Sequence, residues 1–184
     1  MPLCAQPFID ADFIPSSVAL SADARRAEAM QVAQWKPPSD AMPGAVLFPD
    51  DGPLQCDLTS GVALDDRWLA SAIALVATRP ELIVHLFAST EFAERGILTL
   101  RLFKHGKWQP VTVDTMLPCR ADGSVAFVSD ASGASLWPSL LVKALAKLHG
   151  AYSTLSDGSV RCRPPTLPEP RATSVLHDPR PPQP

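Results

Sequence analysis

The sequence contains no long apolar run and no excess of charge of one sign. Its apolar stretches fall well short of the roughly 20 residues that a membrane-spanning helix requires. The first residues, Met1-Pro2-Leu3-Cys4, show neither the basic and apolar regions of a secretory signal nor the glycine that N-myristoylation requires after the initiator methionine. The net charge is only -3, too small to favour nucleic acid or an acidic membrane surface. We therefore expect no integral membrane segment and no nucleic-acid partner.

Cysteine is also scarce, and its spacing argues against two kinds of site. The four cysteines, Cys4, Cys56, Cys119 and Cys162, stand singly, with no C-x-x-C pair and no neighbouring histidine cluster. Structural zinc sites need closely spaced ligand pairs, and disulfide frameworks are typical of shorter secreted chains. We therefore expect reduced, structural thiols in a soluble intracellular protein, either cytoplasmic or associated with the cytoskeleton.

Proline is abundant and unevenly distributed, which divides the chain. Residues 156–184 are rich in proline and hold few large apolar residues. A segment of this composition cannot bury enough surface to offset its ordering entropy, so we expect a disordered tail. Residues 1–6 are expected to be a flexible N-terminus and residues 7–155 one folded domain. The tail contains two P-x-x-P sequences, Pro165–Pro168 and Pro179–Pro182, which SH3-like grooves accept, although a passive tail has the same pattern.

The order of the predicted elements indicates an α+β fold. Helices are predicted over residues 21–35, 66–78, 81–87 and 136–149, and strands over residues 46–48, 97–103, 108–114 and 125–128. Pro110 cannot donate a ladder hydrogen bond, so its strand is expected to lie at a sheet edge or to be bulged there. Gly150 is expected to end the last helix. Helices are thus followed by a small antiparallel sheet and a further helix.

Five segments, in this order, resemble motifs of one protease family. They are Asp10-Ala11-Asp12-Phe13 with Leu20, WKPPSD (35–40), SGVALDDRWLASAI (60–73), Gly106-Lys107-Trp108 with VTVD (111–114) and Leu117-Pro118, and WPSLLVKALAK (137–147). Together they resemble the catalytic domain of calpain-type cysteine proteases, in which the third segment reads QG-x-LGDCWLLAAI. The stretch at residues 75–87 is similar to calpain-like proteins of kinetoplastids in particular.

The resemblance covers only the first of the two subdomains of that domain. It implies a papain-like arrangement with a central buried helix, flanking helices and a small antiparallel sheet. In the family, the first subdomain carries the catalytic cysteine and the oxyanion-hole glutamine, and the second carries the histidine and the asparagine. In this sequence the proline-rich tail begins where the second subdomain is expected.

Several site positions implied by the resemblance hold residues of another kind. Arg67 stands at the position of the catalytic cysteine, and Ser60, or Gly61 in a gapless alignment, stands at the position of the glutamine. Arginine stays protonated and is not a nucleophile, and loss of one oxyanion donor typically costs about a hundredfold or more in rate. The family also binds calcium here. Asp57 matches one acidic ligand as a weak remnant, whereas Ser135 replaces a glutamate, so we expect little calcium binding and no other cofactor.

Other residues with reactive or large side chains are expected to be structural. Asp65 and Asp66 are expected to cap the helix or to pair with Arg67, and Cys56 is expected to be an incidental thiol. His149, near a helix C-terminus, should favour the helix dipole. The histidines without a predicted cysteine partner are His85, His105 and His149. The tryptophans expected in the core are Trp68, Trp108 and Trp137.

Three functions follow from these observations as hypotheses. The leading one is a non-catalytic calpain-like domain that is not an enzyme and acts by protein binding or scaffolding, through its exposed cleft face or its proline-rich tail. An alternative is half of a calcium-dependent cysteine endopeptidase that is active only with a second subdomain. A third is a truncated or degenerate product without a selected function. The sequence predicts neither the identity of a partner nor the oligomeric state.

Overall fold

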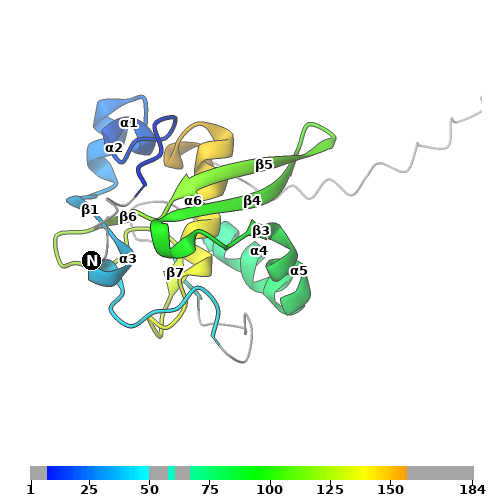
Figure 1. Ribbon diagram of the computed structural model, residues 1–184. Coiled ribbons are helices and arrows are strands. Elements are labelled where there is room, and N and C mark those ends of the chain that lie inside the picture. The colour runs from blue at the N-terminus through cyan, green and yellow to red at the C-terminus, as the bar shows by residue number, and fades with distance from the viewer. Residues whose placement is uncertain (1–7, 50–57, 61–66, 157–184) are drawn as a thin grey trace, which may run out of the picture.

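The α+β fold class is confirmed by the structure, a computed structural model that describes residues 8–49, 58–60 and 67–156. Figure 1 shows a hairpin of strands β4 (Ile97–Lys104) and β5 (Lys107–Asp114) beside the long helix α6 (Trp137–His149). The helices α1 (Ser17–Leu20) and α2 (Ala24–Ala29) lie at one end of the molecule. The predicted flexible N-terminus and the predicted tail lie outside the described residues, apart from Ser156.

Helix α6 is the centre of the fold, and it is buried on almost every side. Trp137 is buried as expected. Leu140 and Ala144 are buried as well, and so are Ser139 and Lys143 on the other faces of the helix. It contacts β4, β5, β6 and β7, as well as the 3-10 turn η2 (Tyr152–Leu155) that follows it. The helix ends where predicted, because Gly150 adopts a left-handed conformation with φ of 101°.

The main sheet is antiparallel, with the strand order β3 (Phe87–Ser89), β4, β5. The β4–β5 register runs from Ile97 opposite Asp114 to Lys104 opposite Lys107. His105 and Gly106 at the turn both have positive φ, as a two-residue type I′ hairpin requires. Strand β5 is an edge strand, so the predicted place of Pro110 is confirmed.

Helices α4 (Arg67–Ala77) and α5 (Pro80–Leu86) pack against each other beside this sheet. Both were predicted, and Pro80 occupies the first position of α5, where its missing N–H costs no helical hydrogen bond. Leu69, Ile73 and Ala77 bury one face of α4, whereas Leu75 on its opposite face is 71% exposed. Within the described ranges, no single helix has the length and apolar character needed to cross a membrane. The α4–α5 pair passes that test only together, with a bend of 110° between the two helices.

The predicted helix over residues 21–35 is wrong in most of its length. Asp23 caps α2 by accepting a hydrogen bond from the Arg25 N–H, and the helix has ended by Gln31, which has a φ of 54°. The chain then forms β1 (Gln34–Lys36), which pairs with β6 (Leu117–Cys119). Pairing with a strand more than 80 residues away in sequence overrides the local helix propensity. The short helices α3 (Pro38–Ala41) and η1 (Ala93–Arg95) were not predicted.

Two predicted short strands are also corrected. Residues 46–48 make only one isolated parallel bridge, between Val46 and Ser135. In residues 125–128, Val125 makes one isolated antiparallel bridge with Cys119, and Ala126, Phe127 and Val128 are buried without forming a strand. The strands that do form nearby are β2 (Leu58–Thr59) and β7 (Ser129–Asp130), which pair with each other. Burial of apolar side chains in this region does not require a regular strand.

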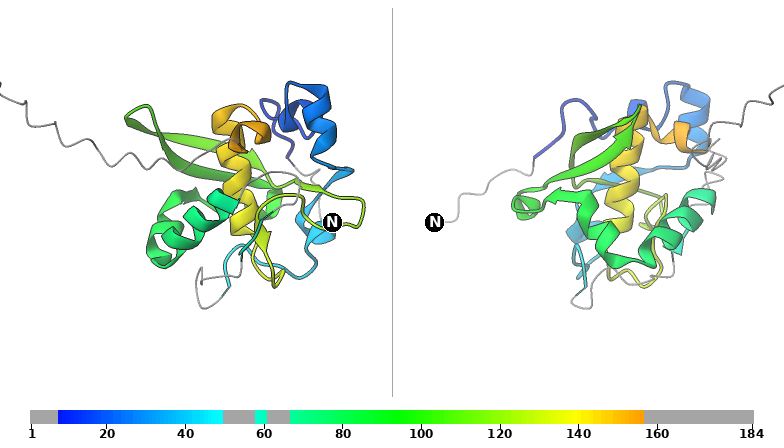
Figure 2. Two further views of the ribbon diagram at one scale, coloured as in Figure 1. Left: turned by 180° about the vertical axis from the view of Figure 1, so that it is seen from behind. Right: turned by 90° about the vertical axis from the view of Figure 1, so that its right-hand side faces the viewer.

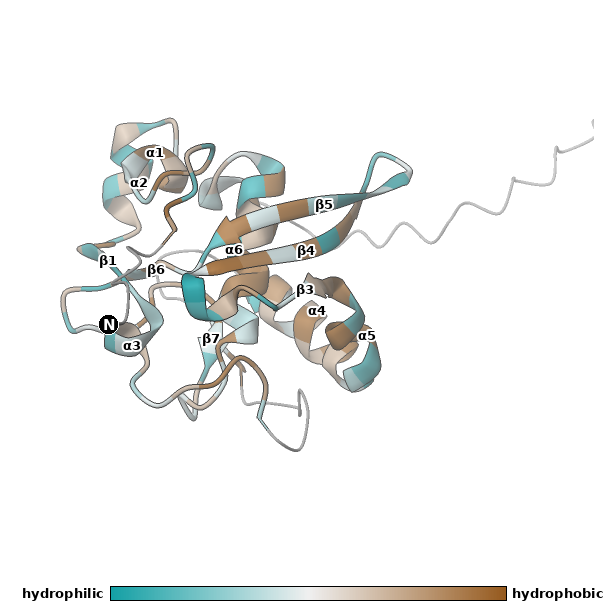
Figure 3. Cartoon of the chain, viewed as in Figure 1, coloured by the Kyte–Doolittle hydropathy of each residue, from teal (hydrophilic) through white to brown (hydrophobic). Residues whose placement is uncertain are grey.

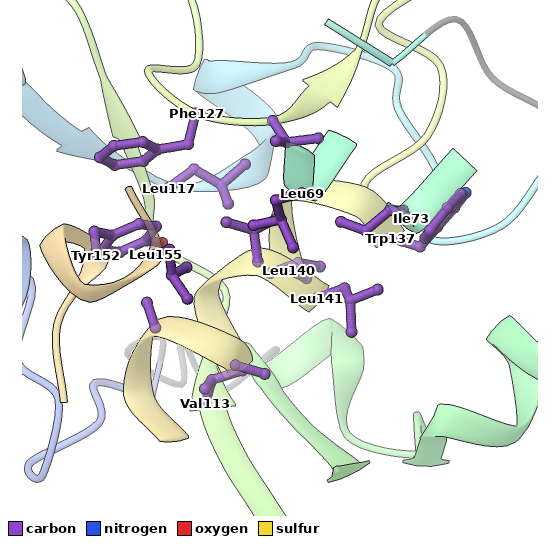
Figure 4. Packing of buried hydrophobic residues seen from close by; sticks show 14 of the residues in the cluster. Leu69, Ile73, Val113, Leu117, Phe127, Trp137, Leu140, Leu141, Tyr152 and Leu155 are labelled. Atoms are coloured by element: carbon purple, nitrogen blue, oxygen red, sulfur yellow. The ribbon is translucent and has the colours of Figure 1, made fainter. Parts of the chain in front are cut away.

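The core joins the two ends of the molecule through α6. Figure 4 shows Leu140 and Leu141 of α6 between Leu69 of α4 and Val113 of β5, with Trp137 beside Ile73. At the other end Phe127 stacks on Tyr152 with ring centroids 4.2 Å apart. The further views in Figure 2 show the α1–α2 pair and the α4–α5 pair at opposite ends of the molecule.

Candidate functional site

The start of α4 presents Arg67 at the protein surface. Arg67 is the first residue of the helix, its side chain is exposed, and its carbonyl accepts a hydrogen bond of 2.8 Å from the Ser71 hydroxyl. Trp68 anchors this first turn, because its indole N–H donates to the Leu155 carbonyl at 2.9 Å. The helix start is therefore held against η2, while Arg67 is exposed. Asp65 and Asp66, predicted to cap this helix, lie outside the described residues.

Ser60, one of the two oxyanion candidates, lies at the edge of an open pocket of about 420 Å³. Thr59, Ser129 and Asp130 also line this pocket, so β2 and β7 form one of its walls. The Thr59 hydroxyl lies 3.0 Å from the Ser129 hydroxyl. Because β2 also contacts α4, this short strand connects the pocket to the helix that begins at Arg67. Gly61, the other candidate, lies outside the described residues.

Ser135, at the position where the resemblance expects a glutamate, is buried and serves a carboxylate instead. Its backbone N–H donates to Asp130 Oδ2 at 2.9 Å, and the Ser132 hydroxyl donates to the same oxygen at 2.7 Å. Burial opposes ionisation of Asp130, but the hydrogen bonds from Ser132 and Ser135 outweigh it and hold the pKa of this carboxyl below its ordinary value. Asp57 lies outside the described residues, and among those described no cluster of three His, Cys, Asp or Glu side chains is placed to hold a metal ion.

Sequence reasoning missed Asp130, although a signal was present. Asp130-Ala131-Ser132-Gly133 has the Asp-x-Ser spacing in which a carboxylate accepts hydrogen bonds from the backbone two residues later. The Ser132 N–H does donate to Asp130 Oδ1 at 3.1 Å. The carboxylate therefore organises its own turn and also fixes Ser135 next to the start of α6.

Four charged residues from three of the quoted motifs form a network that the sequence did not reveal. Lys143 of α6 is fully buried and makes an ion pair with Asp114, which is also fully buried. Lys143 also donates to the Met116 carbonyl at 2.6 Å. Lys147 donates to Asp10 Oδ2 at 2.6 Å, and the Asp10 N–H donates to Asp114 Oδ2 at 3.0 Å. The network joins the entry segment, the end of β5 and α6.

Burial and the neighbouring carboxylate act in opposite directions on the charge of Lys143. Burial lowers the pKa of Lys143, while the adjacent Asp114 raises it. The ammonium also lies 5.3 Å from the centre of the Trp35 ring, a cation–π distance. Two backbone N–H groups, those of Asp10 and Met116, donate to the Asp114 carboxylate. Lys143 and Asp114 are thus buried together, and Asp114 also accepts a hydrogen bond from Asp10. We therefore interpret these charged motif residues as structural.

Cys119 and His149 are two candidate reactive residues that the structure describes. Cys119 is a free thiol in the core, and burial raises its pKa, which disfavours the reactive thiolate form. Burial, then Lys104 and His105, lower the pKa of His149, and the expected effect of the helix dipole stays a prediction. It is Lys104 that donates to the Leu148 carbonyl near the end of α6, at 2.6 Å. Cys4, Cys56 and Cys162 lie outside the described residues.

The sequence pattern of one protein family accounts for this fold and these motifs. Residues 8–162 match the model of the calpain family cysteine proteases. The chain belongs to the calpain family. Among similar proteins, a calpain-type cysteine protease of Arabidopsis thaliana is 34% identical over 84% of the chain, and Calpain-5 of Caenorhabditis elegans is 32% identical over 83% of it. The Calpain-1 catalytic subunit of Mus musculus is 38% identical over 68% of it.

The chain spans only a small part of these calpain relatives, namely 7%, 24% and 18% of their respective lengths. The family match nevertheless corrects one expectation. The sequence led us to expect that the chain is not an enzyme, and the match to a family of cysteine proteases over most of the chain overturns that statement. What is established is a calpain-family cysteine protease domain.

The tryptophans expected at calpain core positions divide into three cases. Trp137 is fully buried, as predicted, and Trp68 is half-buried. Trp108 is 56% exposed, so the prediction that it lies in the core is wrong. It lies on the edge strand β5 and packs edge-to-face on Phe103, with ring centroids 5.4 Å apart. The hairpin projects beyond the core there, so the two aromatic rings shield part of each other from water and are not buried under other elements.

Proposed function

We propose that this chain acts by protein binding, as the first subdomain of a calpain-type domain whose binding face is the exposed side of α4. The observation that carries the proposal is the exposed stripe formed by Arg67, Ser71 and Leu75. These residues are four apart and therefore share one face of the helix. The opposite face of α4 is packed into the core, so the helix is rigid enough to present this stripe.

Leu75 supports an occupant for that face. It is 71% exposed, on a helix that is anchored at its start by the Trp68 hydrogen bond. An exposed leucine on a helix packed in this way marks a surface that gains by being covered. The occupant suggested by the resemblance is the second calpain-type subdomain, present elsewhere in a longer chain or supplied by another protein. A scaffolding role with another protein uses the same face.

The chemistry of Arg67 sets what this face contributes. On the alignment with the family motif, Arg67 stands at the nucleophile position and Ser60 or Gly61 at the glutamine position. A guanidinium donates hydrogen bonds and binds carboxylates, but it does not attack a carbonyl carbon at neutral pH. Any peptide hydrolysis in the assembled protein therefore draws its nucleophile from a residue other than Arg67. With Ser135 in place of a glutamate and Asp57 as the remaining acid, we propose that calcium is not needed for binding.

The reduced thiol of Cys119 and the family resemblance support a place inside the cell, in the cytoplasm or at the cytoskeleton, as part of the same proposal.

Binding to a separately produced second subdomain of a calpain catalytic subunit tests the proposal. Titration calorimetry of the full chain should detect a complex, and Leu75→Glu should weaken it by about tenfold or more, since it places a charge in a desolvated contact. Val18→Glu is the matched control, because Val18 is 72% exposed on α1, at the far end. Equal effects of the two substitutions, or no complex with the unmodified chain, would contradict the proposed face.

The site assignment is tested in the same mixture by Arg67→Cys. If Arg67 stands at the nucleophile position, this variant should gain thiol-dependent cleavage of a peptide substrate over the unmodified mixture. The rate at which a thiol reagent modifies the new cysteine is compared with the rate for Ser71→Cys. If Arg67→Cys binds normally but its cysteine reacts no faster than the one at position 71, the assignment is refuted.

A further inference from the structure

An apolar groove lies between helix α5 and the projecting β4–β5 hairpin, away from the start of α4. Its volume is about 620 Å³, and Val76, Leu82, Leu86 and Trp108 provide its apolar wall. Glu81, His85 and Arg101 also line it. Leu82 is 48% exposed and Trp108 is 56% exposed. In Figure 3 apolar residues extend over α4, α5 and the base of the hairpin that faces them.

The groove has the features that accept a proline-rich segment. An exposed indole supported edge-to-face by Phe103 provides a rigid wall against which proline rings can pack. Leu82 and Leu86 supply an aliphatic floor, and charged groups of both signs, Glu81 and Arg101, stand on the lining. Proline-rich segments bind aromatic-lined grooves as polyproline II helices, which lose little conformational entropy on binding.

We propose that the chain's own segment 163–171 binds this groove. Its sequence, Arg-Pro-Pro-Thr-Leu-Pro-Glu-Pro-Arg, contains four prolines and one leucine between two arginines. Its charges complement those of the groove: an arginine can pair with Glu81, and Glu169 can pair with Arg101. The other P-x-x-P sequence, Pro179–Pro182, also has an acidic neighbour, Asp178, but it holds no leucine or other large apolar residue to pack on the floor of the groove.

The described chain ends close enough for this segment to reach the groove. Leu155 is held against Trp68 on the first turn of α4. Val76, which lines the groove, is eight positions further along the same helix, roughly 12 Å at 1.5 Å per residue. Residues 157–162 span roughly 20 Å when extended. Tethering over so short a distance gives an effective concentration in the mM range, so even weak binding is populated.

The test compares matched variants of the full chain by NMR, following the indole resonance of Trp108 and the hydrogen exchange of β4, β5 and α5. Pro165→Ala with Pro168→Ala should shift that resonance and speed exchange by about two- to tenfold as the groove becomes uncovered. Pro179→Ala with Pro182→Ala, the control in the tail, should change neither. Leu82→Ser should act like the first variant, whereas Val84→Ser should not, since both residues are 48% exposed but only Leu82 lines the groove.

Two further measurements, addition of a peptide and dilution, test whether the chain's own segment or a second copy of the chain occupies the groove. A synthetic peptide of residues 163–171 should restore the original Trp108 resonance in the Pro165→Ala/Pro168→Ala variant but not in Leu82→Ser. The resonance of the unmodified chain should stay constant on tenfold dilution, because the contact is intramolecular. A Trp108 resonance that is the same with and without Pro165 and Pro168 would overturn the proposal. A change on dilution would overturn it in favour of a second copy of the chain. Neither outcome depends on the binding face of α4.

Discussion

Removal of the Lys143 ammonium should cost more stability than removal of any other lysine on α6. Lys143→Met keeps much of the side-chain volume but leaves Asp114, which is fully buried, with two backbone N–H donors from the part of the chain that the structure describes. Breaking a buried ion pair by deleting one partner typically costs about 3–5 kcal/mol. For a domain of this size each kcal/mol corresponds to roughly 2–4 °C in Tm, so a fall of about 10 °C is expected.

Lys147→Met is the graded control on the same helix. Lys147 makes an equivalent bond to Asp10. The Asp10 side chain is only 4% exposed, but that of Lys147 is 19% exposed, so shortening Lys147 opens a path by which water can reach the carboxylate left behind. We expect a loss of about 1–2 kcal/mol. Lys107→Met, at an exposed hairpin position, should cost less than about 0.5 kcal/mol.

Urea unfolding followed by circular dichroism provides the measurement, and a double-mutant cycle isolates the pair. Lys143→Met with Asp114→Asn should lose less than the sum of the two single variants, with a coupling energy of about 2–3 kcal/mol. The reasoning is refuted if Lys143→Met costs no more than Lys147→Met, or if the two single losses add without coupling.

Three further predictions concern single side chains. Asp130→Asn should lower the free energy of unfolding by about 1 kcal/mol at neutral pH. It should also reduce the fall in that free energy when the pH is lowered. The hydrogen bonds from Ser132 and Ser135 keep the pKa of Asp130 low, so their contribution is present above about pH 4 and is lost as the pH falls through the folded-state pKa; urea titrations in acid measure it, and identical acid limbs would contradict it. Burial raises the pKa of Tyr152 well above its ordinary value, so the protein should lose stability as the pH rises above about 10, where the unfolded chain releases the phenolic proton first. Tyr152→Phe should abolish that loss in alkaline unfolding curves. Gly150→Ala should cost about 1 kcal/mol in thermal unfolding, because its φ of 101° is unfavourable for alanine; an unchanged Tm would refute this.

The parts of the fold that were predictable depend on local pattern. Helix α4, helix α5 and the β4–β5 hairpin each carry their own signals: an apolar run ended before a proline, a proline in the first turn, and a tight turn between two β-rich segments. The helix predicted over residues 21–35 failed because β1 is stabilised by pairing with β6, a partner that no local window contains.

The candidate site was predictable by position but not by environment. The motifs placed Arg67 at the start of a helix and Ser135 just before α6, and both are there. They gave no sign that Lys143 and Asp114 would be buried against each other, because charged residues are ordinarily read as exposed. Trp108 misled in the opposite way, since a large aromatic on a projecting hairpin is exposed despite its size.

The bond between Lys147 and Asp10 joins residues 137 positions apart, and this separation has a consequence for synthesis on the ribosome. At about 5–20 residues per second, the entry segment emerges roughly 7–27 s before the lysine that holds it. Strand β1 likewise cannot pair until β6 has been synthesised. During that interval Phe13, Leu20 and Met30, which are buried in the finished protein, have no core to enter. The nascent N-terminal third should therefore be a client of ribosome-associated chaperones until α6 has been made.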